Sequence, residues 1–517
     1  MQKLPLGIQT FSEIRKETYL YVDKTQYLYE LITGGKVYFL SRPRRFGKSL
    51  LLSTLDSLFR GEKKLFKGLW IYDKWDFERF PVISLSMSLT LADTPTIFRD
   101  SLCNLIRKTA DIHKLFLEGS NYKDLFSDLI YKLAREKRVV VLIDEYDKPI
   151  IDHLKNKETA VENREVLKNF YSVLKDLDEY IRFIFLTGVS KFSKTSVFSG
   201  LNNLRDLTVE EKYSEMLGYT AGEMDIYFSG YITSLSKKLE MDREDLMRTI
   251  AEWFNGYSWD SKHKVYNPFS ILSLFLKEEF NNYWFSTGTP NFLIDLIRER
   301  EFELPHLENL LAGDDLLDSF NVEQMSIEAL LFQTGYLTVK GIERRGVRKF
   351  YKLGYPNIEV KESFLNHLVA SYTGKPIGIS DMLFYTMGDD LENEDIPHFF
   401  EKMEGIIAGI PYNLIVEREA YYSSLIYTIL ALVGIRAEFE VQTAKGRLDA
   451  QIEFKEKIYL FEFKYDRPAE EAIEQIIEMR YFDRHKGKGK DVILIGVGFK
   501  RKEKLFEFVS ERWGFST

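Results

Sequence analysis

A nine-residue stretch, Ser41-Arg42-Pro43-Arg44-Arg45-Phe46-Gly47-Lys48-Ser49, decides how the first part of the chain is expected to fold. It follows a short apolar run, Val37–Ser41, and precedes a helical pattern that starts near Ser49. A strand, a loop ending in Gly-Lys-Ser and a helix form the context in which backbone N–H groups and a helix N-terminus bind phosphates. We therefore predict a nucleotide site here, in which Lys48 reaches the β- and γ-phosphates and Ser49 offers its hydroxyl to Mg²⁺.

This stretch departs from the usual phosphate-binding motif at one position. The motif opens with Gly five residues before the Gly-Lys pair, and Arg42 stands in that place. Because Gly takes a positive φ without strain and Arg does not, the loop is expected to have a different shape. Arg44 and Arg45 either add charge-assisted contacts to a phosphate or are simply solvated. The predicted nucleotide-binding residues of the stretch are Arg44, Arg45, Gly47, Lys48 and Ser49.

A second segment, Val139-Val140-Val141-Leu142-Ile143-Asp144-Glu145, strengthens the prediction. Five apolar residues that run into two carboxylates are typical of a buried strand with acids at its C-terminal end, where open α/β sheets bind ligands. Asp144 would hold Mg²⁺ through water, and Glu145 would polarise the attacking water. The alternative is that both acids only cap the next helix. A further run ends in Thr187, where a γ-phosphate sensor could sit.

The chain has 517 residues, which is too long for one hydrophobic core and predicts about two to four domains. Changes in pattern divide it into residues 1–205, 206–400 and 405–517. In the first region short apolar runs alternate with helical patterns, which indicates a mostly parallel sheet with helices on both faces. Its strand candidates are Val37–Ser41, Val82–Met87, Val139–Ile143 and Arg182–Thr187.

Helical periodicity dominates the second region and predicts a helical lid. The helix candidates are Glu211–Leu217, Ala221–Ser236, Asp242–Phe254 and Phe269–Glu279. Strand-like pieces, Gly335–Val339 and Arg348–Leu353, indicate a winged-helix element around Leu331–Leu353. The aromatic residues of this region stand at helical spacing near apolar neighbours, so they are expected to be core rather than a stacking surface.

Composition excludes several classes of protein. A single cysteine, Cys103, cannot form an intramolecular disulfide, and the N-terminus lacks the apolar segment of a secretion signal, so we expect a cytoplasmic protein. The apolar stretch Leu425–Ile435 is far shorter than a membrane-spanning helix, so no membrane partner is expected. The net charge of −8 neither supports nor excludes a nucleic-acid partner.

The third region is expected to form one small αβββαβ domain, with a helix Ala420–Val433 and a last strand Val492–Val497. Within it, side chains two apart on a strand share a face, so Glu462 and Lys464 project together. If the preceding strand pairs as a hairpin through residues 455–457, Asp449 comes beside Glu462. Two carboxylates suit Mg²⁺ or Mn²⁺, and Lys464 would orient or deprotonate an attacking water. The alternative is a structural ion pair.

Several segments together resemble the bacterial AAA-ATPase-like family: Tyr21-Val22-Asp23-Lys24-Thr25, the Arg42–Ser49 stretch, Asp144-Glu145-Tyr146-Asp147-Lys148-Pro149 and Thr187-Gly188-Val189-Ser190-Lys191-Phe192-Ser193. The resemblance covers most of the first 370 residues and implies a P-loop ATPase of the additional-strand, catalytic-glutamate type. Arg42 in place of Gly is usual in this family.

Members of the family usually end in a nuclease-like domain of the PD-(D/E)XK type, which implies a restriction-endonuclease-like fold. The resemblance then assigns Glu419 to the metal site, with Glu417 as an alternative, and accessory roles to Gln475 and Tyr481 on the helix after Lys464. No Pro precedes Asp449, which departs from the ideal pattern.

A basic run, Arg484-His485-Lys486-Gly487-Lys488-Gly489-Lys490, follows that helix. We favour a solvated loop, and the alternative is a salt-sensitive contact with the phosphates of a nucleic acid.

Taken together, these patterns predict an ATP-dependent nuclease that uses ATP and Mg²⁺ or Mn²⁺. DNA is favoured over RNA as the substrate. One alternative is a nucleotide-dependent switch or scaffold that does not cut, and another is a purely structural assembly protein. The oligomeric state stays open. If the protein is a homo-oligomer, the resemblance implies that a neighbour's arginine lies at the γ-phosphate, and the choice among Arg182, Arg205 and others stays open.

Overall fold

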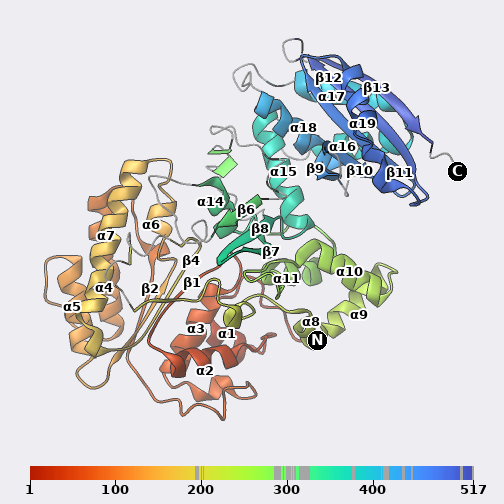
Figure 1. Cartoon of the computed structure of the whole chain (residues 1–517). Helices are drawn as coiled ribbons and strands as arrows, with labels where there is room; N and C mark the ends of the chain where they lie inside the picture. Colours follow the sequence, from red (N-terminus) through yellow and green to blue (C-terminus); the bar gives the residue numbers. More distant parts are fainter. Residues whose placement is uncertain are drawn as a thin grey trace. The chain divides into compact units, whose positions relative to one another are not determined.

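The computed structural model describes residues 1–191, 197–198, 201, 203–284, 293–294, 296–297, 304, 307, 310–313, 326–374, 379–408, 410, 419–433, 437–443, 446–500, 503 and 505–514. The chain folds into two compact units. The first comprises Met1–Gly288 and Leu311–Val360, and the second comprises Thr289–Leu310 and Lys361–Thr517. Figure 1 labels the helices and strands of both units.

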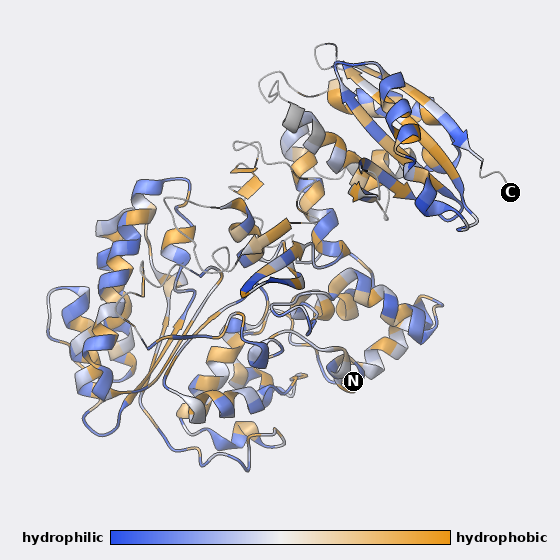
Figure 2. Cartoon of the chain, viewed as in Figure 1, coloured by the Kyte–Doolittle hydropathy of each residue, from blue (hydrophilic) through white to orange (hydrophobic). Residues whose placement is uncertain are grey.

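The first unit is built on a parallel sheet of five strands in the order β2-β3-β4-β1-β5. The strands are β1 (Val37–Ser41), β2 (Val82–Ser86), β3 (Val139–Asp144), β4 (Ile181–Gly188) and β5 (Arg205–Asp206). Burial on both faces explains why the long strands are continuous apolar runs in the sequence, as Figure 2 shows. Strand β4 pairs with both β1 and β3, so it is inserted between the strand that precedes the Gly-Lys-Ser loop and the strand that carries the two acids.

Helices cover both faces of this sheet (Figure 1). One core contains side chains of β1, β3 and β4 together with those of α1 (Phe11–Lys16), α2 (Thr25–Gly34) and α3 (Lys48–Phe59). On the opposite side α4 (Pro95–Ile112), α5 (Tyr122–Leu133) and α7 (Lys157–Asp176) pack together, for example through the stacked rings of Phe126 and Phe170. The short α6 (Lys148–Ile151) and four 3₁₀ turns complete this part of the unit: Lys63–Phe66, Met87–Leu89, Asp178–Tyr180 and Glu211–Tyr213.

Four helices follow in the middle region: α8 (Ala221–Tyr227), α9 (Ser229–Lys238), α10 (Arg243–Phe254) and α11 (Pro268–Lys277). They form a second core with Leu20 and Val22 of the N-terminal segment. The single predicted helix Ala221–Ser236 is wrong, because Phe228 leaves helical geometry (φ −111°, ψ 7°) between α8 and α9. The ring of Phe228 is buried and stacks on Phe275 instead.

The predicted helix Glu211–Leu217 is also wrong, since only the turn Glu211–Tyr213 forms. Helix growth needs the carbonyls of this turn to accept N–H groups four residues later. The Glu211 carbonyl instead accepts from the Ser214 hydroxyl (2.8 Å), and the Tyr213 carbonyl accepts from the buried guanidinium of Arg42 (3.2 Å). Tertiary contacts therefore end this helix after one turn.

A helix and a β-hairpin close the first unit. Helix α14 (Ile327–Thr334) ends at Gly335, and the hairpin of β7 (Thr338–Arg345) and β8 (Arg348–Gly354) follows. These strands join β6 (Leu310–Gly313) in a three-stranded sheet with the order β6-β8-β7. A helix followed by a hairpin is the arrangement that a winged helix would need, and that assignment stays a prediction.

The second unit is built on a mixed sheet with the order β13-β12-β11-β10-β9. The strands are β9 (Ala437–Gln442), β10 (Arg447–Glu453), β11 (Lys457–Tyr465), β12 (Asp491–Lys500) and β13 (Leu505–Trp513). Strands β10 and β11 form an antiparallel hairpin, and β11 pairs with β12 in parallel after a crossover through α19 (Ala469–Glu478). The sequence predicted β12 as the last strand, and this is wrong. Strand β13 follows it and pairs with it at the edge of the sheet.

Helices lie on both sides of the second sheet. Side chains of α19 share a core with β10, β11 and β12. The other side is covered by α17 (Ile396–Ala408) and α18 (Glu419–Val433), whose aromatic rings contact those of the strands, as Phe399 contacts Phe461 and Tyr427 contacts Phe439. The remaining helices are α15 (Ile358–Thr373), which contains the division between the units, and α16 (Ile379–Glu392).

The expected fold class is confirmed: an N-terminal parallel α/β sheet, a helical middle region and a C-terminal α/β domain. Among the helices that the structure describes, none is both long and apolar enough to span a membrane.

Candidate nucleotide and nuclease sites

The sheet of the first unit brings the predicted nucleotide residues to one edge. In the ladder Leu40 pairs with Thr187, and Ile143 pairs with Leu186, so β1, β3 and β4 end at the same level. Because all three strands are parallel, their C-terminal ends present the loop before α3, the two acids and Thr187 on the same side.

Asp144 lies at the centre of this edge and accepts three hydrogen bonds. Ser49 Oγ donates to Asp144 Oδ2 (2.5 Å), while Thr187 Oγ1 (2.6 Å) and the Glu145 backbone N–H (3.0 Å) donate to Asp144 Oδ1. A carboxylate that accepts three donors is held in one orientation. The three residues predicted to act together at a Mg²⁺-bound phosphate, Ser49, Asp144 and Thr187, are therefore in direct contact.

Lys48 is buried inside the loop that precedes it. Its Nζ donates to the carbonyl oxygens of Arg42 and Pro43, at 2.8 Å each. Burial lowers the pKa of Lys48 to about 8, although the charges of Asp144 and Asp147 oppose this shift. Two neutral carbonyls are weak partners for a buried ammonium, so an anion bound in the loop would stabilise its charged form.

Arg42 explains why the first Gly of the usual motif is dispensable here. Its side chain is 1% exposed and donates to the carbonyls of Ser41 (2.9 Å), Thr208 (2.8 Å) and Tyr213 (3.2 Å), while its guanidinium lies 3.8 Å from the ring centre of Trp259. The left-handed backbone of the loop falls at Arg45 (φ 69°) and Gly47 (φ 89°) instead. Arg42 therefore stabilises the loop through buried contacts with the protein and is not placed to contact a phosphate.

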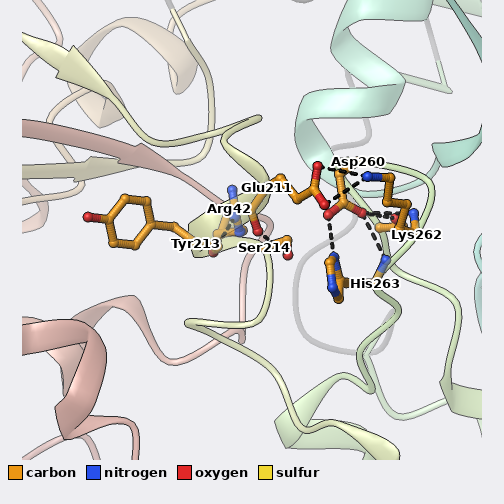
Figure 3. Close-up of polar contacts among 8 residues, drawn as sticks. Arg42, Glu211, Tyr213, Ser214, Asp260, Lys262 and His263 are labelled. Atoms are coloured by element: carbon orange, nitrogen blue, oxygen red, sulfur yellow. Dashed lines mark hydrogen bonds and ion pairs between the residues drawn. The ribbon is translucent and has the colours of Figure 1, made fainter. Parts of the chain in front are cut away.

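Figure 3 shows further contacts of the segment Glu211–Tyr213, whose Tyr213 carbonyl accepts a hydrogen bond from Arg42. Lys262 Nζ forms an ion pair with Glu211 (2.8 Å), two residues before Tyr213. Asp260 accepts from the backbone N–H groups of Lys262 and His263 (2.9 Å each) and contacts the His263 ring. The loop before α3 thus depends on residues more than 160 positions away.

A pocket of about 400 Å³ opens beside the loop. Its polar lining includes Gly47, Lys48, Ser49 and Glu145, together with Arg44 and Arg45. Its apolar lining was not predicted from the sequence, and it includes Pro5, Ile8, Tyr219, Pro268, Phe269 and Leu272. Arg45 is exposed, and its guanidinium lies 4.8 Å from the ring centre of Phe269. The lining therefore offers both cationic groups and apolar surface to a ligand.

Glu145 has a left-handed backbone (φ 51°) and faces this pocket. Burial and the neighbouring charge of Asp144 raise its pKa. Neither acid caps α6, whose N-cap residue is Asp147. Glu145 thus lines the pocket, Asp144 contacts Ser49 beside it, and the capping alternative has no support in the hydrogen bonds.

Asp147 is a functional candidate that the sequence reasoning did not single out. It is buried, and its carboxylate accepts from the backbone N–H groups of Val189 (3.1 Å) and Ser190 (2.6 Å) and from the Ser190 hydroxyl (2.6 Å). These bonds tie the loop after β3 to the end of β4. The position of Asp147 within the motif Asp144–Pro149 was the sequence signal that could have identified it.

In the second unit, the predicted lysine and carboxylate meet on the side of the sheet that faces α19. Lys464 Nζ lies 3.4 Å from Glu462 Oε1 and donates to Gln475 Oε1 (2.6 Å), and Gln475 Nε2 also donates to Glu462 Oε1. Gln475 therefore orients both neighbours. Asp449 accepts from the Phe463 backbone N–H at 2.8 Å, which places its carboxylate beside the same strand.

The sequence predicted Tyr481 on the same helix as Gln475, and this is wrong. Helix α19 ends at Glu478, and Arg480 takes left-handed backbone geometry (φ 52°), so Tyr481 begins a separate 3₁₀ turn, Tyr481–His485. Its hydroxyl donates to the Arg447 carbonyl at 2.9 Å. Tyr481 thus supports the start of β10, close to Asp449.

The residues present fit a divalent cation in two respects. Glu462 is 2% exposed, and its Oε2 is buried without a hydrogen-bond partner. Burial, followed by the charge of Asp449, raises the pKa of Glu462 to about 8, so a nearby positive charge would stabilise the ionised pair. Hard oxygen ligands of this kind suit Mg²⁺ or Mn²⁺.

A third carboxylate ligand cannot be drawn from the described part of the chain. There, no group of three or more His, Cys, Asp or Glu side chains gathers as a ligand set. Glu419 is the first residue of α18, but the structure does not describe its side chain, and Glu417 lies outside the described residues.

The basic run after α19 is largely compensated by acids. Arg484 pairs with Glu438 (3.6 Å), Lys486 with Asp483 (3.1 Å) and Lys490 with Glu453 (2.6 Å). These pairs agree with the solvated-loop interpretation rather than with a phosphate contact.

Two family models match the chain. Residues 5–198 match the model described as "Predicted AAA-ATPase", and residues 417–508 match that of the PD-(D/E)XK nuclease superfamily. An uncharacterized protein in the vnfD 5′ region of Azotobacter chroococcum mcd 1 is 41% identical over 525 residues, which are 99% of this chain and 99% of that one. The solved structure of the Aeropyrum pernix ORC2 protein (ADPNP–ADP complexes) aligns over 65% of this chain and 88% of that one, with 14% identity and a TM-score of 0.24. A similarity that low carries no conclusion about this chain.

The resemblance drawn from the sequence motifs is confirmed for both parts of the chain. The chain belongs to the family of its Azotobacter relative, and it combines a predicted AAA-ATPase domain with a domain of the PD-(D/E)XK nuclease superfamily.

Proposed function

We propose that this protein is an ATP-dependent nuclease, in which the nucleotide state of the first unit controls hydrolysis of phosphodiester bonds by the second. The observation that carries the proposal is the arrangement around Glu462. Lys464 and Gln475 hold one of its oxygens, while the other oxygen is buried, unpaired and close to Asp449. An unpaired buried polar atom is costly, and a bound cation would offset that cost at this oxygen.

Each residue of the second unit has a distinct task in the proposed cleavage. Asp449 and Glu462 would bind Mg²⁺ or Mn²⁺, and the bound cation would offset the negative charge that develops on the scissile phosphate. Lys464, held by Gln475, would orient the attacking water. Tyr481 and Gln475 are positioning residues, since they hold the Arg447 carbonyl and the Lys464 amine.

The first unit would bind ATP in the 400 Å³ pocket. Lys48, Arg44 and Arg45 line the pocket and would contact the phosphates, with Ser49 and Asp144 at the Mg²⁺ position and Thr187 beside the γ-phosphate. The apolar lining from Ile8 and α11 would receive the base. Glu145 would polarise the attacking water at the phosphate end.

The central test is incubation of the purified protein with labelled single- and double-stranded DNA and RNA, with and without ATP and Mn²⁺. We expect cleavage that requires the metal, increases with ATP and favours DNA over RNA. Glu462→Ala and Lys464→Ala should each reduce cleavage at least a hundredfold. Lys48→Ala should abolish ATP binding in a calorimetric titration and the effect of ATP on cleavage, but leave the second unit folded.

Glu507→Gln is the matched control, because Glu507 lies exposed on β13 of the same sheet and, among the described residues, forms its ion pair with Lys500. It should cleave like the wild type. Equal cleavage by wild type, Glu462→Ala and Lys464→Ala would remove the assignment of the site.

A second candidate is a nucleotide-dependent switch whose C-terminal unit binds partners without cutting. One observation favours it: the described residues supply two carboxylates at this site and no third. Glu419→Ala distinguishes the two functions. It should weaken Mn²⁺ affinity and cleavage together if Glu419 completes a working site, and change neither if the unit does not cut.

A further inference from the structure

The hairpin of β7 and β8 carries an unusual concentration of positive charge for a chain with a net charge of −8. Between Lys340 and Lys352 there are six cationic side chains and one carboxylate, Glu343. This stretch is hydrophilic in Figure 2, and Val347 at the turn is fully exposed.

The pairing of the two strands sets like charges against each other. Arg344 lies directly across from Lys349, and Arg345 lies directly across from Arg348. Like charges at directly opposed positions destabilise an antiparallel pair, so the isolated hairpin end is under electrostatic repulsion. A bound polyanion would relieve this repulsion, whereas a purely structural hairpin gains nothing from it.

Most of these cations are available for a ligand. Within the described part of the chain, Arg344, Arg348, Lys349 and Lys352 are exposed and form no ion pair. Arg345 lies 3.6 Å from Glu343, and both side chains are at least half exposed, so this pair is weak. The Arg345 guanidinium also lies 5.6 Å from the ring centre of Phe350, and Lys340 donates to the Pro356 carbonyl at 3.1 Å.

The base of the hairpin is fixed to the nucleotide-binding part of the first unit. Ser258 N donates to Thr338 Oγ1 (2.7 Å), and Val339 N donates to the Ser258 carbonyl (3.1 Å). Gly335, just before β7, approaches Pro43 so closely that a Cβ atom would lie 2.6 Å from that ring. The charged end is thus held by a rigid base that contacts the Arg42–Ser49 loop.

We propose that the β7–β8 hairpin binds duplex nucleic acid through its phosphate backbone. A two-stranded β-ribbon fits the major groove of B-form DNA, and rows of Lys and Arg side chains are the groups that neutralise phosphates. A nucleic acid is favoured over an acidic protein because the same chain carries a domain of a nuclease superfamily. The inference rests on the proposed function for the identity of the substrate and adds the surface that holds it.

Binding is tested without cleavage, by the fluorescence anisotropy of a labelled 30-base-pair DNA duplex in EDTA over a series of salt concentrations. Arg344→Ser/Lys349→Ser should lower the affinity at 0.1 M salt at least tenfold. It should also reduce the slope of log K against log salt by about 1.8, since each lost phosphate contact removes roughly 0.9. Its melting temperature should not fall, because the change removes a repulsive pair.

Arg107→Ser/Lys108→Ser is the matched control, because it removes the same charge from two exposed positions of α4 that form no described ion pair. It should bind like the wild type, and Glu462→Ala should do so as well. Equal losses in the control and hairpin variants would reduce the effect to net charge and overturn the proposal. If Glu462→Ala abolished cleavage but kept hairpin-dependent binding, both proposals would be supported. If the wild type bound DNA through the hairpin but did not cleave it, only the nuclease proposal would be refuted.

A direct readout of binding at the hairpin is possible because the single cysteine of the chain, Cys103, is buried. Val347→Cys places one accessible thiol at the hairpin turn for an environment-sensitive dye. The dye should respond to duplex DNA in proportion to binding. No response at saturating DNA, or a response only to anionic phospholipid vesicles, would overturn the proposal.

Discussion

At the scale of single residues, the guanidinium of Arg42 acts as part of the core. It fills a site between the Thr208 and Tyr213 carbonyls and the ring of Trp259. A fork of five N–H donors and a flat, weakly hydrated surface make arginine suited to such a site, and lysine could not replace it. The loop before α3 therefore takes its shape from a side chain that never meets the ligand.

Arg42→Gly tests this role, since it restores the residue that the usual motif has at this position. We expect weaker ATP binding rather than stronger, together with a loss of about 3 kcal/mol of stability, because buried carbonyls lose their donors. Calorimetric titration and thermal unfolding measure the two effects. Arg135→Gly, at an exposed turn, is the control. Normal ATP affinity in Arg42→Gly would contradict the supporting role.

Glu359 gives a prediction for pH. It is fully buried and accepts from Ser270 Oγ (2.8 Å) and from the backbone N–H groups of Tyr283 (2.7 Å) and Trp284 (2.8 Å). Burial raises its pKa to about 7, although these hydrogen bonds oppose the shift. The folded protein then holds a proton that the unfolded chain releases above pH 4.5, so its stabilising contribution is complete below pH 4.5 and is lost as the pH rises through 7.

Glu359→Gln should remove that pH dependence. The amide can still accept from the two N–H groups and can donate to Ser270, so the variant should fold. Its melting temperature should vary less between pH 5 and 7 than that of the wild type, by an amount that corresponds to roughly 1–3 kcal/mol. Parallel pH profiles for the two proteins would show that Glu359 does not titrate in this range.

At the scale of elements, the junction between α14 and β7 packs directly on the nucleotide loop. Gly335 has a φ of 93°, and a Cβ atom there would meet the Pro43 ring at 2.6 Å. Gly335→Ala should therefore displace the loop as well as strain the turn, and should reduce ATP affinity at least tenfold. Gly346→Ala is a close match, because that residue also has a positive φ (64°) but open space around it. It should cost about 1 kcal/mol and leave ATP affinity unchanged. Equal affinities in both variants would contradict the contact with Pro43.

At the scale of the whole molecule, two compact units with separate ligands should unfold separately. Calorimetry should show two transitions. ATP at 100 times its Kd should stabilise only the first unit, by about 2.7 kcal/mol, and Mn²⁺ in the absence of ATP should stabilise only the second. Lys48→Ala should remove the first shift and Glu462→Ala the second, so each variant is the control for the other. A single transition that responds to both ligands would show that the units unfold as one.

Local sequence patterns predicted much of the architecture. The apolar runs at β1, β3 and β4 marked the parallel strands because a strand buried on both faces needs apolar side chains at every position. Period-two alternation placed Glu462 and Lys464 on one face for an equally local reason. The helix Glu211–Leu217 failed because the buried Arg42 takes one of the carbonyls that it would have used.

The sequence by itself determined the parallel sheet, the Gly-Lys-Ser loop, the acids after β3 and the strand that carries Glu462 and Lys464, since each depends on residues that are neighbours in the chain. Only the tertiary structure decided that Arg42 is a buried support, that residues near positions 5 and 270 line one pocket, and that Glu462 keeps an unpaired oxygen beside Asp449. Those features arise where segments far apart in sequence meet, and burial and hydrogen bonding there depend on all of the neighbouring segments at once.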